Sequence, residues 1–480
     1  MLTTVLTNIF TDIGEWLNTA IADTCDFIWT YLLIIILIGC GLYFTYRLKF
    51  FQFRMLGEMF RLLIDSSGSK KGERHITSFQ AFAISVATRV GTGNLAGVAT
   101  AIAIGGPGAV FWMWMIALVG ASSAFVESTL AQLYKRRGKY SFIGGPAYYI
   151  LHGLHKPWMA SLFAVLITLT FGLSYNSIQS NTICSAMNEA FGFDPFITGV
   201  VIAAVALVIV FGGIRRIANV SSIIVPFMAI GYFLIALVII ILNIDQIPHI
   251  LRLIVESAFG FGQFAGGAIG ITIMNGIKRG LFSNEAGEGS APNVAATAHV
   301  THPVKQGLVQ SLGVFTDTLL VCSCTAFIIL ISGLYNNPDL NGIVLTQNAL
   351  TNEIGEIGKT IVAVAVFFFA FSSIIGNYYY GEANIRFLTS KRSALVIFRI
   401  FSAGAFVLFG AIAKLNLVWT IGDLCMALLT ACNLVAIVLL GKYAFRLLDD
   451  YRSQKRRGIK DPIFKSTLIP EIKNDLDAWN

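Results

Sequence analysis

The sequence predicts an all-α polytopic membrane protein, and three observations lead to this class. Hydrophobic residues make up 56% of the 480-residue chain and charged residues only 12%, whereas a soluble domain carries about 25% charged residues. The apolar segments run to roughly 20 residues, the length of a membrane-spanning helix and about twice that of a barrel strand. Lysine and arginine gather in the short connections between these segments, as membrane topology requires.

Eleven apolar spans follow one another along the chain. They cover residues 27–46, 78–104, 109–134, 157–190, 195–213, 221–242, 262–280, 304–333, 357–380, 394–413 and 417–440. The fourth is long enough to tilt strongly or to project beyond the bilayer. A shorter segment, 246–259, alternates Ile and Leu with polar residues at helical spacing, and we expect it to lie along the outer interface.

The distribution of basic residues predicts the orientation. With the N-terminus outside, 29 of the 34 lysines and arginines fall in inside loops and the tail, and three fall outside. Eleven spans then place the C-terminus in the cytoplasm. The polar, basic tail 449–480 is predicted to be a solvated cytoplasmic segment that can contact anionic lipid.

Several function classes are disfavoured by what the sequence lacks. The net charge of +8 resides in loops and tail, and no basic patch interleaved with aromatics indicates nucleic acid. Six of the seven cysteines lie in apolar segments, which argues against a disulfide framework. All six histidines lie in loops or at the interface, and no phosphate-binding G-x-x-x-x-G-K-[ST] motif occurs. A membrane-embedded enzyme and ATP-driven transport are therefore disfavoured, and the spans are too apolar for a channel.

The second span is interrupted near its middle by glycines and polar groups. Glycine in a helix interior costs roughly 1 kcal/mol relative to alanine, and polar groups at membrane depth need partners. A span that accepts both keeps backbone groups free to hold a ligand. The residues are Gly91, Gly93 and Gly97, with Arg89, Thr92 and Asn94.

A second glycine-rich stretch opens the seventh span, with glycines at 260, 262, 266, 267 and 270. Spans two and seven are five apart, so ten spans form two sets of five, each led by a broken helix. An odd number of spans per set makes the second set inverted, and matched broken helices indicate a transporter's midplane site. The predicted units are 1–76, the repeats 77–243 and 244–448, and the tail. The alternative is that these glycines are helix-packing contacts of the G-x-x-x-G kind. A dinucleotide fold is disfavoured, because the third glycine and the strand context are missing.

Four motifs resemble the alanine/glycine:cation symporter family. They are T-S-F-Q-A (77–81), R-V-G-T-G-N-L-A-G-V-A (89–99), G-G-P-G-A-V-F-W-M-W (105–114) and R-G-L-F-S-N-E-A-G-E-G-S-A-P-N (279–293). The likeness runs from about residue 27 to the tail with the motifs in order. It implies a leucine-transporter-like fold of one N-terminal helix plus a five-plus-five inverted-repeat core with two discontinuous helices.

The resemblance also implies an activity. The chain is expected to be a sodium-coupled symporter of a small neutral amino acid, alanine or glycine first, in the bacterial cytoplasmic (inner) membrane. Sodium and the amino acid would be its ligands and lipid its surroundings, with no enzymatic role, no cofactor and no indicated oligomer. Glutamine or serine preference and proton coupling stay open as alternatives.

An amino-acid zwitterion needs donors for its carboxylate and acceptors for its ammonium group. Free N–H groups and the positive dipole end at an interrupted helix suit the carboxylate, and the predicted residues are Gly91, Thr92, Gly93 and Asn94. Free carbonyls of the broken seventh span suit the ammonium group, and the predicted residues are Gly266, Gly267 and Gly270.

The resemblance adds side chains to this site. It implies substrate contact by Gln179, for which an ordinary interhelical hydrogen bond is an equal alternative. Asn377 departs from the tryptophan typical of the family, which leaves room for a larger or amide-bearing substrate. By analogy with the leucine-transporter fold, sodium would bind the carbonyls of Ala87 and Val90 and the hydroxyls of Ser372 and Ser373. The alternative for the two serines is back-bonding within their helix.

Arg89 is the unexplained charge in this stretch, because a guanidinium cannot be neutralised at membrane depth. Glu127 and Asp317 are the embedded acids, and we hypothesise that Arg89 pairs with one of them. The alternatives are that Arg89 replaces a cation at a second ion site, or that the acids carry protons.

Overall fold

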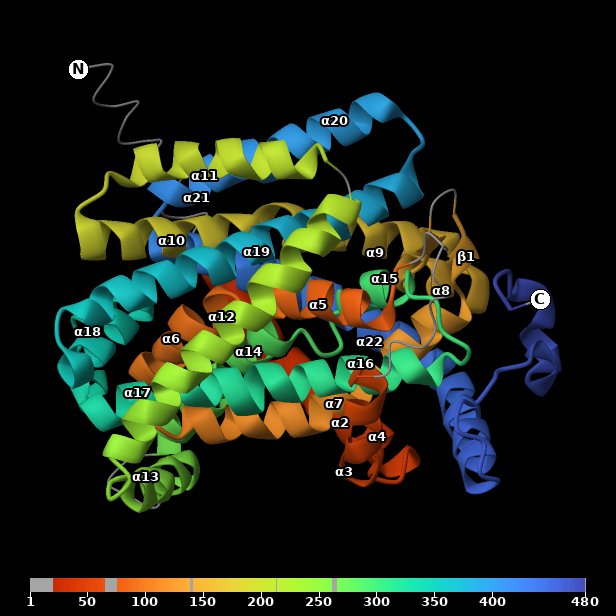
Figure 1. The fold of residues 1–480 in the computed structure, drawn as a ribbon, viewed down its shortest axis with the longest axis horizontal. Coiled ribbons are helices and arrows are strands. Elements are labelled where there is room, and N and C mark those ends of the chain that lie inside the picture. The colour runs from red at the N-terminus through yellow and green to blue at the C-terminus, as the bar shows by residue number, and fades with distance from the viewer. Residues whose placement is uncertain (1–19, 65–75, 139–140, 213, 261–265, 480) are drawn as a thin grey trace.

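The computed structural model describes residues 20–64, 76–138, 141–212, 214–260 and 266–479, and the side chains of 214–226, 228 and 266–268 lie outside the description. Nearly all of the chain that is described is helical, and most long helices run in roughly one direction (Figure 1). A two-stranded antiparallel ribbon, β1 (Arg136–Arg137) and β2 (Phe142–Ile143), is the only sheet in these ranges. The all-α prediction is confirmed.

The first half of the chain forms these elements: η1 (Trp29–Leu33), α2 (Ile34–Arg47), α3 (Phe51–Arg54), α4 (Leu56–Ile64), α5 (Ser78–Arg89), η2 (Gly93–Gly97), α6 (Val98–Gly105), α7 (Ala109–Leu133), α8 (Pro146–Gly153), α9 (Pro157–Leu169), η3 (Thr170–Tyr175), α10 (Asn176–Phe191), α11 (Pro195–Val210) and α12 (Ile214–Leu242). The second half forms α13 (Ile247–Phe259), α14 (Gly266–Asn284), α15 (Ala291–Ala295), α16 (Val304–Val314), η4 (Phe315–Cys322), α17 (Ser323–Ser332), η5 (Leu334–Asn336), α18 (Gly342–Ile354), α19 (Ile357–Leu388), α20 (Arg392–Ile400), η6 (Phe401–Ala405), α21 (Phe406–Ile412), α22 (Leu415–Arg456), η7 (Ser466–Leu468) and η8 (Pro470–Asp475).

Seven helices among the described residues are long and apolar enough to cross a membrane, or up to eight if one bent pair counts as a span. The seven are Ala20–Arg47, Ala109–Leu133, Pro157–Phe191, Val304–Ser332, Ile357–Leu388, Arg392–Ile412 and Leu415–Arg456. The other four predicted spans are interrupted, short, bent or more polar, so the count of eleven stays a prediction. The segment expected at the outer interface is the separate helix α13, which turns 104° from the end of α12.

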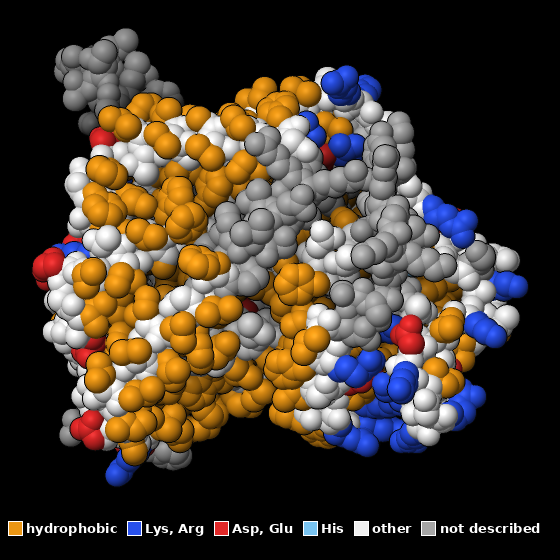
Figure 2. Space-filling view, in the orientation of Figure 1, with side chains coloured by type: hydrophobic (Ala, Val, Ile, Leu, Met, Phe, Trp, Pro, Cys, Tyr) orange, Lys and Arg blue, Asp and Glu red, His pale blue; other side chains and the backbone are white. Residues whose placement is uncertain are grey.

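The surface agrees with a membrane location. Hydrophobic side chains cover most of the face seen in Figure 2, and Lys and Arg gather at the end of the molecule near α8 and the C-terminus (Figures 1 and 2). Inside the bundle α10 packs on α19 and α21, while α14 and α16 pack on α7. The interrupted second span lies within this packed interior, and residues 81–102 are buried.

Two basic residues do not lie where the charge pattern predicts. Lys278 and Arg279 were assigned to an inside loop, but they belong to α14, with side chains 7% and 6% exposed. Both face Asp423 of α22, and Lys278 also lies 3.5 Å from Asp26 near the start of the first span.

The C-terminal tail is also different from its prediction as a solvated segment. Phe464 donates its backbone N–H to Thr301 at 2.9 Å, and the Trp479 indole donates to the Gln132 carbonyl at 2.9 Å. Lys305 pairs with Asp461 of the tail. The tail contains apolar side chains that allow it to pack against the loops after α7 and α15. A count of charge over the whole segment does not reveal them.

Candidate functional site

The first break lies where the glycine pattern predicts it. Helix α5 begins with a capping box between Thr77 and Gln80 and ends at Arg89. Val90 has φ −75° and ψ 89°, so the chain leaves the helical path there and resumes it at Gly93. The interruption of the second span is confirmed, and it lies in the protein interior.

Gly91 brings the broken backbone against two other helices. A Cβ on this residue would lie 2.3 Å from the Ser373 hydroxyl of α19 and 3.0 Å from Oε1 of Gln179 of α10. Any larger residue would force these two side chains to move, so the present approach depends on glycine. The break, α10 and α19 therefore meet at one point.

Two side-chain amides hold the N–H groups of the break. The Oε1 atom of Gln179 accepts from the Thr92 backbone N–H at 3.0 Å and from the Thr92 hydroxyl at 2.6 Å. The Oδ1 atom of Asn94 accepts from the Gly91 N–H at 2.9 Å. Two of the donors predicted for a substrate carboxylate, the N–H groups of Gly91 and Thr92, are thus occupied by amide oxygens, while the Asn94 N–H bonds to the Gly91 carbonyl at 3.3 Å.

The residues predicted for sodium are brought together. Ser373 donates to the Ala87 carbonyl at 3.0 Å, and Ser372 lies 3.3 Å from the same oxygen. Both hydroxyls also reach the Phe369 carbonyl one turn back, so helix back-bonding and contact with the break coexist. Val90 lies at the break itself, where the backbone turns out of the helix.

The glycine-rich start of the seventh span does not form the second break. Gly266, Gly267 and Gly270 lie in the first turns of α14, which is continuous to Asn284, and Gly262 lies outside the described residues. Ser283 of the same helix contacts Gly93, so Gly270, thirteen residues earlier, is roughly 20 Å away along the helix. Because α14 is continuous over Gly266, Gly267 and Gly270, their carbonyls lie within a helix rather than at a break, and binding of the ammonium group by them stays a prediction.

Glycine in α14 serves helix packing. A Cβ at Gly276 would lie 2.5 Å from the Ala109 carbonyl, and one at Gly280 would lie 2.6 Å from Ile116, both on α7. Small residues at such positions let two helices approach closely. Helix packing is the alternative explanation of the glycine patterns, and it applies to this helix.

The second break instead follows α14, at residues 285–290. Glu285, Gly287 and Gly289 have φ values of 56°, 94° and 80°, which end the helix before α15 begins. Sequence reasoning missed this break because the segment is polar and lies beyond the apolar window. The signal was present in the S-N-E-A-G-E-G-S motif, whose spaced glycines suit a left-handed backbone.

Buried acids organise the second break. Glu127 of α7 accepts the N–H groups of Gly287 at 3.3 Å and Gly289 at 3.1 Å, and the Asn433 amide at 2.8 Å. Glu285 accepts from the hydroxyl groups of Ser290 at 2.5 Å and Thr88 at 3.4 Å. A loop that lies inside the bundle thereby has partners for its exposed backbone groups.

Asp317 of η4 joins the two interrupted segments. Its Oδ1 atom accepts from the Asn94 amide at 2.7 Å, and its Oδ2 atom accepts from Ser283 at 2.7 Å and Thr318 at 3.0 Å. Asn94 belongs to the first break and Ser283 to the end of α14. A movement of either segment would therefore change the hydrogen bonds of the same carboxylate.

Arg89 does not form the hypothesised ion pair with Glu127 or Asp317. One guanidinium nitrogen donates to the Gln310 carbonyl at 3.1 Å, while Nε and Nη2 have no partner among the described residues. The hydrogen bonds that both acids form with the described residues go to amides, hydroxyls and backbone N–H groups.

An aromatic cluster that the sequence did not reveal covers the site. Phe282 lies beside Tyr175 and Trp419, with ring centroids 4.7 Å apart in both pairs. The guanidinium of Arg279 lies 4.3 Å from the Trp419 ring and pairs with Asp423. These residues come from three separate helices, so no local pattern predicts their meeting.

Asn377 lies one helical turn beyond Ser373 on α19. It is 1% exposed, and neither its amide nitrogen nor its amide oxygen has a partner among the described residues. A buried polar group without a partner costs roughly 1–3 kcal/mol. Substrate contact by Asn377 stays a prediction, and its amide has capacity to form hydrogen bonds.

Comparison with known proteins decides the family. Residues 14–466 match the sodium:alanine symporter family. The chain belongs to this family.

Curated relatives extend over nearly the whole chain. The probable sodium/glutamine symporter GlnT of Bacillus subtilis is 51% identical over 95% of this chain and 94% of its own length. The amino-acid carrier protein AlsT of the same organism is 51% identical over 97% of this chain and 98% of its own length. The sodium/alanine symporter AgcS of Methanococcus maripaludis is 39% identical, covering 86% of this chain and 93% of its own length.

Proposed function

We propose that this protein couples the entry of sodium to the uptake of a small neutral amino acid, alanine or glycine first, by alternating access. Eleven spanning helices, one N-terminal and ten in two inverted sets of five, would place the two breaks at the middle of a bacterial cytoplasmic membrane. The N-terminus would lie outside and the C-terminus in the cytoplasm. Family membership and the apolar surface support this proposal.

One observation carries the proposal: the Ser372 and Ser373 hydroxyls converge on the Ala87 carbonyl directly beside the break at Gly91. Sodium prefers several oxygen ligands, and here two serine hydroxyls lie together with backbone that is not in a helix. The N–H groups of Gly91 and Thr92 lie next to this oxygen cluster and suit a carboxylate. Sodium and substrate sites that share one backbone break are coupled, because filling one fixes the geometry of the other.

The amides that now occupy the break would make way for substrate. Gln179 and Asn94 would release the N–H groups of Thr92 and Gly91 to the substrate carboxylate and could bind its ammonium group through their oxygens. The corrected position of the second break makes the carbonyls near Ser283 the other candidates for that group. Each bond lost is replaced, so the exchange costs little net hydrogen bonding.

Glutamine is the second candidate substrate. The unpartnered amide of Asn377 offers one donor and one acceptor, which matches the two groups of a carboxamide. The relative GlnT, at 51% identity, is described as a probable sodium/glutamine symporter. Proton coupling stays an alternative, because one relative of Bacillus subtilis, 45% identical, is described as a putative sodium/proton-dependent alanine carrier protein.

Uptake into proteoliposomes tests the proposal. Labelled alanine, glycine, serine and glutamine are supplied with an inward sodium gradient, and separately with a proton gradient. We expect accumulation driven by sodium and abolished when the gradient is dissipated. Accumulation of none of the four amino acids under either gradient would overturn the proposal.

A further inference from the structure

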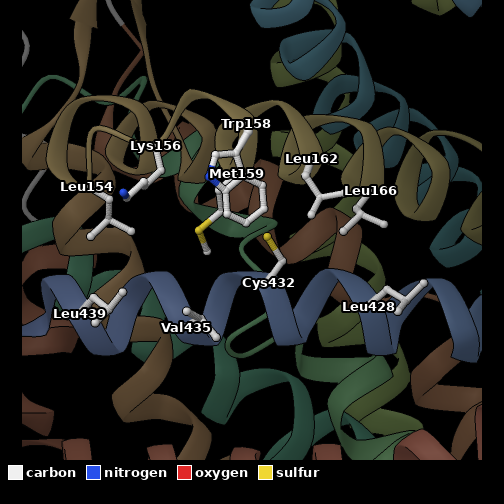
Figure 3. A pocket seen from close by; sticks show the side chains of 10 residues that line it. All are labelled: Leu154, Lys156, Trp158, Met159, Leu162, Leu166, Leu428, Cys432, Val435 and Leu439. Atoms are coloured by element: carbon white, nitrogen blue, oxygen red, sulfur yellow. The ribbon is translucent and has the colours of Figure 1, made fainter.

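A long apolar groove runs along the outside of the bundle between α9 and α22, and none of its lining residues belongs to the two breaks. Its volume is about 600 Å³. Figure 3 shows its side chains facing each other across the two helices. The lining residues are Leu154, Lys156, Trp158, Met159, Leu162, Leu166, Leu428, Cys432, Val435 and Leu439.

The groove opens to the bilayer. Trp158, Leu439 and Val435 are 67%, 58% and 51% exposed, and no helix among the described residues covers them. The floor is lower at Cys432, whose short side chain lies between larger neighbours (Figure 3). Lipid is the only medium that would face these side chains in a spanning protein.

The length of the groove matches one leaflet. Leu428 and Leu439 mark its ends on α22, and eleven residues of helix span roughly 17 Å. Half of a hydrocarbon core about 30 Å thick is about 15 Å. The groove can therefore hold an acyl chain over its full depth.

A single cation lies at one end of the groove. Lys156 precedes the first residue of α9, and its ammonium group has no hydrogen bond or ion pair among the described residues. Figure 3 places it near Leu154 and Leu439, at the end of the molecule where basic residues gather. The neighbouring His155 faces Asp475 at 3.7 Å and does not neutralise Lys156. Trp158, two residues on, has the amphipathic ring that favours the headgroup level.

We propose that this groove is a binding site for an anionic phospholipid, with an acyl chain between α9 and α22 and the phosphate at Lys156. The groove is apolar and has an unpaired cation at its interfacial end. It is therefore more complementary to an anionic phospholipid than to a lipid with a zwitterionic headgroup. A second copy of this chain is the competing occupant, and it is disfavoured because a concave groove needs a ridge to fill it. The inference rests on membrane insertion alone and does not depend on which amino acid is carried.

Native mass spectrometry of the purified full-length protein tests the site. Phosphatidylglycerol and phosphatidylcholine with the same acyl chains are titrated onto the wild type, Lys156→Gln and Cys432→Trp. Lys391→Gln, at an exposed lysine before α20, is the matched control. Val435→Trp is a second groove-filling variant should Cys432→Trp fold poorly, because the Val435 side chain is half exposed.

The expected result is one phosphatidylglycerol bound more tightly than phosphatidylcholine. Lys156→Gln should weaken phosphatidylglycerol binding about fivefold and leave phosphatidylcholine binding unchanged, while either tryptophan should abolish the bound lipid. Equal binding of the two lipids, or equal effects of Lys156→Gln and Lys391→Gln, would overturn the proposal. A wild-type dimer that either tryptophan converts to monomer would assign the groove to a second copy instead.

Discussion

The two breaks in the interior differ in length and in the groups that hold them. The first spans residues 90–92 and is held by hydroxyl and amide side chains of Ser373 and Gln179 against a bare glycine. The second spans residues 285–290, has three residues with positive φ, and is held by the Glu127 carboxylate. The backbone N–H groups of the first break are therefore held by neutral amides that a ligand can replace, with the Asp317 carboxylate behind Asn94, whereas those of the second break are held directly by a carboxylate.

This difference predicts separate consequences for function and stability. Neutral oxygen and N–H groups exchange partners with a zwitterion or a sodium ion at little cost. A carboxylate that satisfies two buried backbone N–H groups cannot be removed without leaving them unpaired. Substitutions at the first break should change transport, and those beneath the second should change stability.

Gly91→Ala should have the largest effect on transport. A Cβ 2.3 Å from the Ser373 hydroxyl and 3.0 Å from Oε1 of Gln179 would displace the two side chains that hold the break. We expect sodium-driven uptake to fall at least about a hundredfold, as when a positioning group is displaced by about 1 Å. Gly270→Ala is the control: nothing lies within 4 Å of its Cβ, so uptake should persist and stability should rise by up to about 1 kcal/mol. Loss of uptake in Gly270→Ala would restore the glycine-rich start of the seventh span as a ligand site.

Glu127→Ala should have the largest effect on stability. It removes the acceptor of the Gly287 and Gly289 N–H groups and of the Asn433 amide, which should destabilise the protein by about 3 kcal/mol. Thermal unfolding in detergent measures the loss, with Glu256→Ala on the surface of α13 as the control. A variant that unfolds like the wild type would remove the distinction between the two breaks.

Asn377→Ala should change selectivity at the first break. If its amide binds a substrate carboxamide, the ratio of kcat/KM for glutamine to that for alanine should fall about tenfold, the equivalent of one lost hydrogen-bonding group. Asn348→Ala, whose amide only contacts the Val344 carbonyl on its own helix, is the control. An unchanged ratio would remove the argument for glutamine.

Glu58→Gln should have the smallest effect of these substitutions, because Glu58 lies outside both breaks. Burial raises the pKa of this carboxyl, but hydrogen bonds from Arg61, Tyr451 and Lys455 outweigh it and lower the pKa to about 2. Because this lies below the ordinary value of 4.5, the contact stabilises the protein above about pH 4.5 and is lost as the pH falls toward 2. We expect Glu58→Gln to lower stability by about 1 kcal/mol at pH 7, with a difference from wild type that shrinks below pH 4.5. A difference that is constant with pH, or any change in uptake at pH 7, would contradict this assignment.

The first break could be predicted from the sequence because the residues that interrupt the helix are neighbours in the chain. Glycines and polar residues interrupt an apolar run, and the structure shows the interruption at the same residues. The second break was misplaced because counting glycines cannot distinguish Gly276, which packs against α7, from Gly289, which takes a positive φ. That distinction depends on what lies opposite each residue.

Long-range partners were the other limit of the sequence. The contact of Ser373 with Ala87 joins residues 286 apart, and it was expected only through resemblance to a known fold. The burial of Arg279 against Asp423, and the docking of Trp479 beneath α7, have no local signature. Counting charges therefore places Arg279 in a loop and the segment that contains Trp479 in solvent.

The sodium dependence of uptake by Ser373→Ala tests the central claim most directly. Initial uptake of alanine and glutamine is measured against sodium concentration in proteoliposomes, with Ser332→Ala at the end of α17 as the control. Loss of one oxygen ligand should raise the half-saturating sodium concentration about tenfold, and Ser332→Ala should match the wild type. A half-saturating sodium concentration unchanged by Ser373→Ala would contradict a sodium site at the first break.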